Sequence, residues 1–288
     1  MTLITKLKLN QNTIAIICDC DDTLAPDTTG FLLDYNGLSQ KLFWENISRM
    51  VSQGWDPPLA YMNEILELMK SGHIEQDTVE KLAILGRQIK PYKGVTEFIP
   101  ELKSMIKQNR DFVKAGVNLE CYIISSGIED LIKGSILSKY FDDIFAGKFS
   151  TDMHGFITGI MSSVTFTEKT KFLYAINKGV AGTDLRKKPY LVNNAVKRVD
   201  RRIPFEHMIY LGDGPSDIPC FSAIRGYGGN CIGIVGKDSA IKGYELARGK
   251  RTTVGPYSRD YRKGSDLRMM LETIINKVGY QIITKHKE

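Results

Sequence analysis

The chain has 288 residues, of which 42% are hydrophobic and 25% are charged, and its formal net charge is +6 at pH 7. This composition is typical of an ordinary soluble globular protein, and the length suits one large domain or a main domain that carries a smaller one. The positive charge is compatible with a phosphate-bearing partner, but net charge by itself decides nothing about fold.

Neither export nor membrane insertion is indicated. The apolar run nearest the start of the chain, Thr13–Cys18, is too short for a signal peptide or for a membrane span, which needs about 20 apolar residues. The five cysteines are odd in number, and the Cys18-x-Cys20 pair has no second Cys or His pair to complete a metal site. We therefore expect reduced, buried thiols in a cytoplasmic protein.

Four short apolar runs predict buried parallel strands: Thr13–Cys18, 119–124, 208–211 and 231–235. Each of the first three is followed directly by a polar cluster. In open α/β sheets, ligands bind beyond the carboxyl ends of the strands, so these clusters predict one shared site. The predicted fold class is α/β, with a Rossmann-like, mostly parallel sheet as its core.

A helical stretch separates the first two strands. Apolar residues recur at helical spacing over 38–51, 59–69 and 79–89, with Pro57 and Pro58 at an expected helix start, and no strand-like alternation interrupts them. We expect a helical cap over residues 30–90, inserted into an α/β core formed by 1–29 and 91–288.

Further along, residues 143–149 and 156–161 flank a turn and predict a β-hairpin. A helix is expected over 168–178 and another over 267–278. Basic residues crowd the connection 186–202 and the tail segment 248–263.

The first polar cluster, Asp19-Cys20-Asp21-Asp22-Thr23-Leu24, places several carboxylates directly after an apolar strand. Neighbouring like charges raise one another's pKa and resist burial, a cost that a bound divalent cation would remove. Mg²⁺ prefers a few carboxylates together with substrate phosphate oxygens. An acidic turn that caps the next helix is the alternative, and we favour the functional interpretation.

The second cluster contains Ser125, Ser126 and Glu129. Ser126 and Glu129 match a capping box, which assigns Ser126 to the N-cap and leaves the Ser125 hydroxyl for a phosphate oxygen. Lys169 follows a second predicted capping box, in the first turn of its helix, where a nearby phosphate or carboxylate would offset its unfavourable interaction with the helix dipole. Lys171 is a rival for the same role.

The third cluster, Gly212-Asp213-Gly214-Pro215-Ser216-Asp217, places glycines on both sides of Asp213. Glycines permit tight backbone geometry beside a ligand. Asp217 lies one helical turn further on if a helix begins at Pro215. The cluster supplies a second acidic group for a cation.

Together, these four motifs resemble the haloacid dehalogenase superfamily, specifically its phosphatases, in their order from Asp19 to Asp217. The helical insertion after the first motif, the hairpin before Lys169 and the stretch Pro91-Tyr92-Lys93-Gly94-Val95 are similar to the phosphoserine phosphatase branch.

The resemblance implies that Asp19 is the nucleophile and that Asp21 is the general acid and base. It implies a metal site for Mg²⁺ at Asp19, Asp21, Asp213 and Asp217, with Ser125 and Lys169 binding the phosphoryl oxygens. Two residues depart from the pattern: Asp22 stands where Gly or Ser is common, and Ser216 where these phosphatases usually have Asn. No residues are identified that would clamp an amino acid, so phosphoserine does not carry over as the substrate.

We expect hydrolysis of a small phosphorylated metabolite. A phosphotransferase differs only in the hydroxyl that accepts the phosphate, and the basic segments keep the ends of nucleic acids as an alternative. A dehalogenase would need neither a metal nor a leaving-group acid, and a non-catalytic phospho-ligand module would not need Asp21. The sequence does not indicate the oligomeric state.

Overall fold

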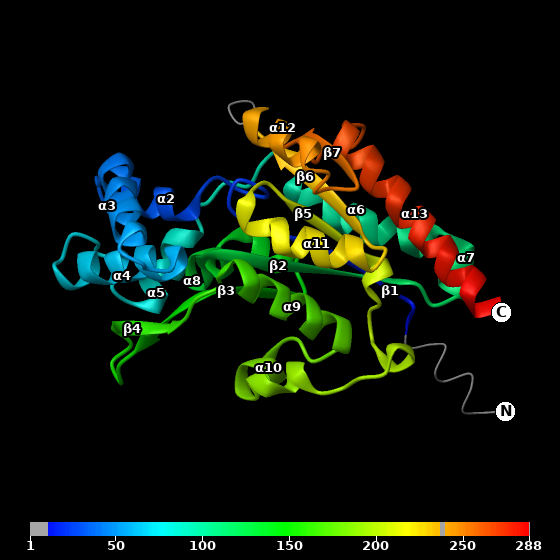
Figure 1. The fold of residues 1–288 in the computed structure, drawn as a ribbon, viewed down its shortest axis with the longest axis horizontal. Coiled ribbons are helices and arrows are strands. Elements are labelled where there is room, and N and C mark those ends of the chain that lie inside the picture. Colours follow the sequence, from blue (N-terminus) through cyan, green and yellow to red (C-terminus); the bar gives the residue numbers. More distant parts are fainter. Residues whose placement is uncertain (1–10, 237–239, 288) are drawn as a thin grey trace.

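A computed structural model describes residues 11–236 and 240–287. Residues 1–10, 237–239 and 288 lie outside the described part of the chain. One seven-stranded sheet runs through the molecule in the order β4-β3-β2-β1-β5-β6-β7, and only the β3–β4 pair is antiparallel (Figure 1). The strands are β1 Thr13–Cys18, β2 Asn118–Ile128, β3 Asp143–Thr151, β4 Ile157–Ser162, β5 Met208–Gly212, β6 Asn230–Val235 and β7 Val254–Ser258.

The central strand, β1, is buried along its whole length, as its unbroken β-branched sequence predicts. It pairs in parallel with β2 on one side and with β5 on the other, and Cys18 lies opposite both Ile123 and Leu211. The polar clusters that follow these strands therefore leave the same edge of the sheet. The predicted α/β class and mostly parallel core are confirmed.

Helices cover both faces of the sheet because side chains of β1 alternate between them. Ile14 and Ile16 pack in one apolar cluster with α6 (Val95–Gln108) and α13 (Asp266–Lys287). Ala15 and Ile17 belong to a second cluster, with α9 (Phe166–Lys178) and α11 (Ile218–Gly226). Shorter elements are α7 Arg110–Lys114, α8 Glu129–Gly134, α10 Thr183–Lys187, α12 Ala240–Arg248 and 3-10 helices at Ile136–Lys139, Pro189–Asn193, Arg198–Asp200, Phe205–His207 and Pro215–Asp217.

Four helices follow β1 and form a group beyond the strand ends (Figure 1): α2 Thr28–Tyr35, α3 Gln40–Ser52, α4 Pro57–Lys70 and α5 Val79–Gly86. The helical conformation of α3, α4 and α5 was predicted, including the start of α4 at Pro57, whereas α2 was not predicted as a separate helix. Their buried side chains form a third apolar cluster, which also takes in Ile128, Leu131 and Phe149 from β2, α8 and β3. The division into a cap, 30–90, and a core stays a prediction.

Both predicted capping boxes were wrong, and one strand was missed. The Thr165 side chain, at the N-cap of α9, makes no capping hydrogen bond. Ser126 is not an N-cap, because β2 stays extended through Ile128 and α8 begins at Glu129 without a side-chain cap. The tail also contributes an edge strand, β7, that was not predicted. Its Gly255-Pro256 pair is unfavourable inside a strand, although edge strands tolerate proline.

Among the described residues, no helix combines the length and the apolar character needed to cross a membrane. All five cysteines are buried and have free thiols, as predicted.

Helices α5 and α8 approach so closely that both need glycine at the contact. A Cβ on Gly86 would lie 2.2 Å from the Leu131 carbonyl oxygen, and a Cβ on Gly134 would lie 2.2 Å from the Ala83 carbonyl oxygen. Both obstacles are backbone atoms, which cannot rotate away. This contact joins the α2–α5 group to the helix that follows β2.

We therefore expect Gly86→Ala to lower the free energy of unfolding by about 1–3 kcal/mol, the usual cost of overpacking. Urea denaturation of both proteins measures the difference. Gly226→Ala is the matched control, because Gly226 also ends a helix but a Cβ there meets open space. Equal stability of Gly86→Ala and the control would contradict the close contact.

Candidate active site

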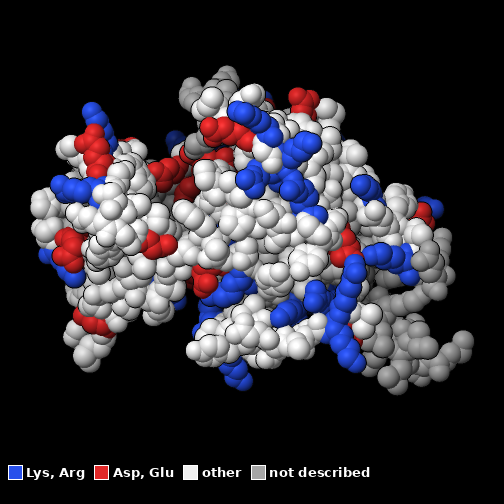
Figure 2. Space-filling model, in the orientation of Figure 1, with Lys and Arg blue, Asp and Glu red and all other residues white. Residues whose placement is uncertain are grey.

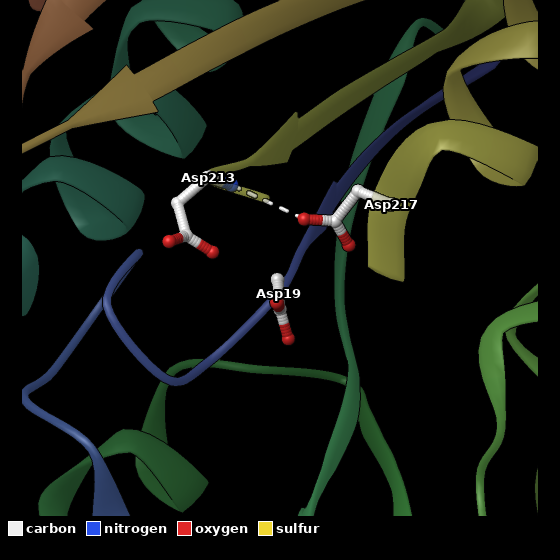
Figure 3. Close-up of side chains that lie close together, drawn as sticks. All are labelled: Asp19, Asp213 and Asp217. Carbon is white, nitrogen blue, oxygen red and sulfur yellow. Dashed lines mark hydrogen bonds between the residues drawn. The ribbon is translucent and has the colours of Figure 1, made fainter. Parts of the chain in front are cut away.

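Three carboxylates converge where the central strands end (Figure 3). Asp19 follows β1, Asp213 follows β5, and Asp217 ends the short 3-10 helix that leads into α11. Each is buried, and one oxygen from each lies within 4.8 Å of the others. The parallel pairing of β1 with β5 produces this convergence of residues nearly 200 positions apart.

Lys169 lies between two of these carboxylates. Its side chain is completely buried, and its Nζ lies 3.0 Å from Asp19 Oδ2 and 2.8 Å from Asp217 Oδ1. Although burial lowers the pKa of Lys169, its ion pairs with Asp19 and Asp217 raise it overall, so the ammonium stays charged. Lys171, the rival in the sequence, instead pairs with Glu168 in the same helix, partly exposed.

Asp217 holds this arrangement together. Its Oδ1 also accepts a hydrogen bond from the Tyr210 hydroxyl at 2.8 Å. Its Oδ2 accepts from the backbone N–H groups of Asp213 at 3.1 Å and Gly214 at 3.3 Å, the former drawn in Figure 3. Both oxygens are engaged, which suits Asp217 to orienting its neighbours.

The donor set fits a hard divalent cation. The ligand atoms at the cluster are carboxylate oxygens, which Mg²⁺ prefers over nitrogen or sulfur. Burial, and next the charge of Asp217, raise the pKa of Asp19 well above its ordinary value. A cation beside Asp19 would stabilise its anionic form. Asp19 and Asp213, at the ends of the adjacent strands β1 and β5, both line the cavity and could hold such an ion.

Asp21 lies beside this cluster and has a perturbed pKa. Burial, and next the charge of Asp27, raise the pKa of Asp21 from 3.8 to about 7. Its Oδ1 accepts a hydrogen bond from the Thr28 backbone at 2.8 Å, which fixes the carboxyl at the start of α2. A carboxyl group with this pKa can both donate and accept a proton near neutral pH.

Ser125 is fully buried next to Asp21, with 3.5 Å between Ser125 Oγ and Asp21 Oδ2. Its Oγ accepts a hydrogen bond from the Gly127 N–H at 2.9 Å. The adjacent cavity is lined by Ser126 and Gly127 rather than by Ser125. The Ser126 carbonyl accepts a hydrogen bond from the Tyr61 hydroxyl, which connects α4 to this strand end.

A cavity of about 290 Å³ opens onto these groups. Its acidic lining residues are Asp19, Asp21, Asp22, Asp27 and Asp213. Acidic side chains are also visible at the junction between α2–α5 and the sheet (Figure 2). Asp27 was not identified from the sequence, although the Pro-Asp-Thr-Thr pattern is a helix N-cap signal, and Asp27 does cap α2.

The rest of the cavity lining is mostly apolar. Its apolar and aromatic residues are Trp44 and Ile47 from α3, Pro57, Pro58 and Tyr61 from α4, and Phe166 from α9. Helical periodicity predicts that α3 and α4 bury one face, but it does not reveal which buried residues face a cavity. No sequence signal distinguished these aromatic residues from an ordinary core.

Asp22 has an ion-pair partner from the basic tail. Its backbone is left-handed, with φ of 58°, a conformation that Gly adopts more easily and Asp tolerates. The Arg259 guanidinium lies 3.0 Å from Asp22 Oδ1, and the Tyr92 hydroxyl donates to the same oxygen at 3.2 Å. The departure from the family pattern at Asp22 thus joins the acidic loop to β7.

No family model matches the sequence. An uncharacterized protein of Borreliella burgdorferi strain B31 is 24% identical over 242 residues, which cover 75% of this chain and 79% of that protein. A phospho-aspartyl intermediate analogue of phosphoserine phosphatase superposes with a TM-score of 0.53 and 18% identity, over 91% of this chain and 99% of the other. A substrate-bound phosphoserine phosphatase superposes with a TM-score of 0.51 and 16% identity, with the same coverage.

This chain has the phosphoserine phosphatase fold. The fold implied by the four motifs is thereby confirmed, and the phosphoserine phosphatase fold here brings the Asp19, Lys169 and Asp213 motifs to one edge of the sheet.

The raised pKa of Asp21 predicts a pH-dependent stability. Between pH 3.8 and about 7 the folded protein binds more protons at Asp21 than the unfolded protein does, so the free energy of unfolding falls as the pH rises through this window. Asn resembles the protonated carboxyl and removes the effect. In excess chelator, Asp21→Asn should match the wild-type Tm below pH 4 and exceed it above pH 7.

Thermal unfolding between pH 3.5 and 8.5 tests this expectation. Asp111→Asn is the control, because it makes the same substitution at an exposed position on α7, outside the site. A Tm difference for Asp21→Asn that does not change with pH would contradict the buried, titrating carboxyl.

Proposed function

We propose that this protein is a Mg²⁺-dependent phosphomonoester hydrolase that acts through an aspartyl-phosphate on Asp19. The observation that carries the proposal is the buried ammonium of Lys169 between Asp19 and Asp217, together with the cavity that Asp19 and Asp21 line. A fixed positive charge next to a carboxylate is suited to a reaction in which anionic phosphoryl oxygens approach that carboxylate.

In the first step, an Asp19 carboxylate oxygen attacks phosphorus and the bond between phosphorus and the ester oxygen breaks. Asp21 donates its proton to the departing alkoxide, and the pKa of about 7 leaves a substantial protonated fraction at neutral pH. In the second step, Asp21 takes a proton from water, which attacks phosphorus and releases inorganic phosphate and the Asp19 carboxylate.

Lys169 and the Ser125 hydroxyl supply donors for the transferring phosphoryl group, and Asp217 keeps the Lys169 ammonium in position. Asp19 and Asp213 would hold Mg²⁺, with the backbone of Asp21 as a further ligand and Asp217 orienting the group. The ion would neutralise charge on the phosphate when bound. The α2–α5 helices would act as a cap that excludes water from the site.

The comparisons support this reaction in one respect: one similar structure is named for a phospho-aspartyl intermediate analogue of phosphoserine phosphatase. A phosphotransferase would use the same residues, with an alcohol in place of water in the second step. Release of inorganic phosphate in water, without an added acceptor alcohol, favours the hydrolase. The free thiols and the small cavity agree with a cytoplasmic enzyme of metabolite chemistry.

Ion pairs between the basic segments and acidic side chains of the same chain also favour a small substrate over the end of a nucleic acid. In the connection 186–202, Arg186 pairs with Asp143 at 2.8 Å, and Arg202 forms two hydrogen bonds with Glu120. Lys and Arg side chains on the face shown in Figure 2 lie in separate groups rather than in one continuous track. Arginines that neutralise the protein's own acids are less available to phosphates.

We expect Asp19→Asn to lower phosphate release from p-nitrophenyl phosphate at least about a thousandfold, because the amide is not a nucleophile. Lys169 keeps its partner Asp217 in this variant, so the fold should persist, which circular dichroism can check. Asp111→Asn serves as the carboxylate control on the surface. Substantial activity in folded Asp19→Asn would place the nucleophile elsewhere.

Activity should be lost in excess chelator and return with Mg²⁺, because unshielded carboxylates at Asp19 and Asp213 repel the substrate phosphate. Asp213→Asn should raise the Mg²⁺ concentration for half-maximal activity by at least about tenfold. Titration of Mg²⁺ against initial rate measures both effects. Full activity in excess chelator is the result that would rule out the metal.

A further inference from the structure

We propose that the substrate is the phosphate ester of a small alcohol that carries a cationic ammonium group. The ammonium would lie between the carboxylate of Asp27 and the aromatic rings of Trp44, Tyr61 and Phe166. This proposal rests on the proposed function, because it assigns the leaving group of that reaction.

Among the described residues around the cavity, the Asp27 carboxylate is the one left to pair with a charged group of the substrate. None of the described residues that line the cavity is Lys, Arg or His. Asp19 pairs with Lys169 and Asp22 pairs with Arg259, whereas no described Lys, Arg or His forms an ion pair with Asp27. Asp21 and Asp213 belong to the proposed chemistry. Asp27 is therefore the acidic group of the cavity that has neither a cationic partner among the described residues nor a part in the proposed reaction.

A bound cation would stabilise the ionised form of Asp27. Burial, which is the largest effect, raises the pKa of Asp27. Hydrogen bonds from the Gly30 and Thr29 backbone oppose this effect, the charges of Asp22 and Asp34 add to it, and the net shift of the pKa is upward. A ligand carboxylate next to Asp27 would add another negative charge without a counter-ion. A ligand ammonium would instead neutralise Asp27 in a partly desolvated position, where such interactions are strong.

The aromatic wall has the character of a cation-binding surface. Trp44 and Tyr61 both line the cavity, and their rings lie 6.0 Å apart between centroids and are inclined at 71° to each other. The Tyr61 hydroxyl is hydrogen-bonded to the Ser126 carbonyl, which holds that ring in place. Phe166 adds a third ring from α9. The negative faces of aromatic rings attract ammonium groups, and Trp does so most strongly.

The cavity volume limits the size of the alcohol. The cavity volume of about 290 Å³ lies just below the usual range for small-molecule sites, roughly 300–1,000 Å³. This space suits a phosphate with a leaving group of several heavy atoms. A phosphorylated amino acid has an ammonium group as well, but its carboxylate would have no basic partner among the described lining residues.

Asp27 also has a structural role, and the test must separate the two roles. Its Oδ1 accepts a hydrogen bond from the Thr29 N–H at 3.0 Å and caps α2. Asn caps helices about as well as Asp. Asp27→Asn therefore keeps the cap and removes the charge.

The experiment compares three substrates with Mg²⁺: phosphocholine, its uncharged carbon analogue 3,3-dimethylbutyl phosphate, and phosphoserine. We expect kcat/KM for phosphocholine to exceed that for the uncharged analogue by about tenfold, and to exceed that for phosphoserine as well. In Asp27→Asn and in Trp44→Leu, the ratio of phosphocholine to the analogue should fall towards one. Trp55→Leu should keep the wild-type ratio, because Trp55 does not line the cavity.

A wild-type ratio of one or less would overturn the proposal, and so would a high ratio that persists in both cavity variants. A general loss of folded protein lowers both rates equally and leaves their ratio unchanged. Trp44→Leu provides an independent test if Asp27→Asn does not fold. Turnover of p-nitrophenyl phosphate distinguishes failure of the ammonium site from failure of the proposed hydrolase. If the enzyme hydrolyses p-nitrophenyl phosphate but does not prefer phosphocholine, only the ammonium site is refuted. If it does not hydrolyse p-nitrophenyl phosphate, the proposed hydrolase and the ammonium site are refuted together.

Discussion

The ion-pair arrangement of Lys169 with Asp19 and Asp217 is the interaction on which the site depends. A fully buried ammonium is costly unless it is paired, and loss of one partner in such a site typically costs about 3–5 kcal/mol. The pairing joins the end of β1, the first turn of α9 and the turn before α11. These segments are separated by about 150 and about 50 residues in the chain, so the arrangement exists only in the folded sheet.

The surrounding hydrogen bonds give this arrangement a defined geometry. Tyr210 and the backbone of Asp213 and Gly214 occupy the Asp217 carboxylate, which leaves it little freedom to turn away from Lys169. Preorganised charges of this kind need no rearrangement during a reaction, which is the physical basis for assigning phosphoryl chemistry to this edge of the sheet.

In the proposed enzyme, the strand ends and the helices supply different parts of the cavity lining. The strand ends contribute the carboxylates, and helices α3 and α4 contribute most of the apolar wall, with Tyr61 bonded across to Ser126. The close glycine contact between α5 and α8 connects these helices to the segment after β2. The glycine contact, this hydrogen bond and the apolar cluster that includes Ile128, Leu131 and Phe149 thus hold the helices against the strand ends that bear the proposed reacting groups.

The sequence alone determined the α/β class, the central strand and the positions of Asp19, Lys169 and Asp213, because unbroken apolar strands and the polar residues after them are local patterns. It did not reveal that Ser126 stays in an extended strand whose carbonyl accepts a hydrogen bond from Tyr61, or that Pro256 lies in an edge strand. Trp44, Phe166 and Arg259 owe their places to helix and strand packing between distant segments. Local sequence shows that a side chain is apolar or charged, but only the tertiary structure decides which group it faces.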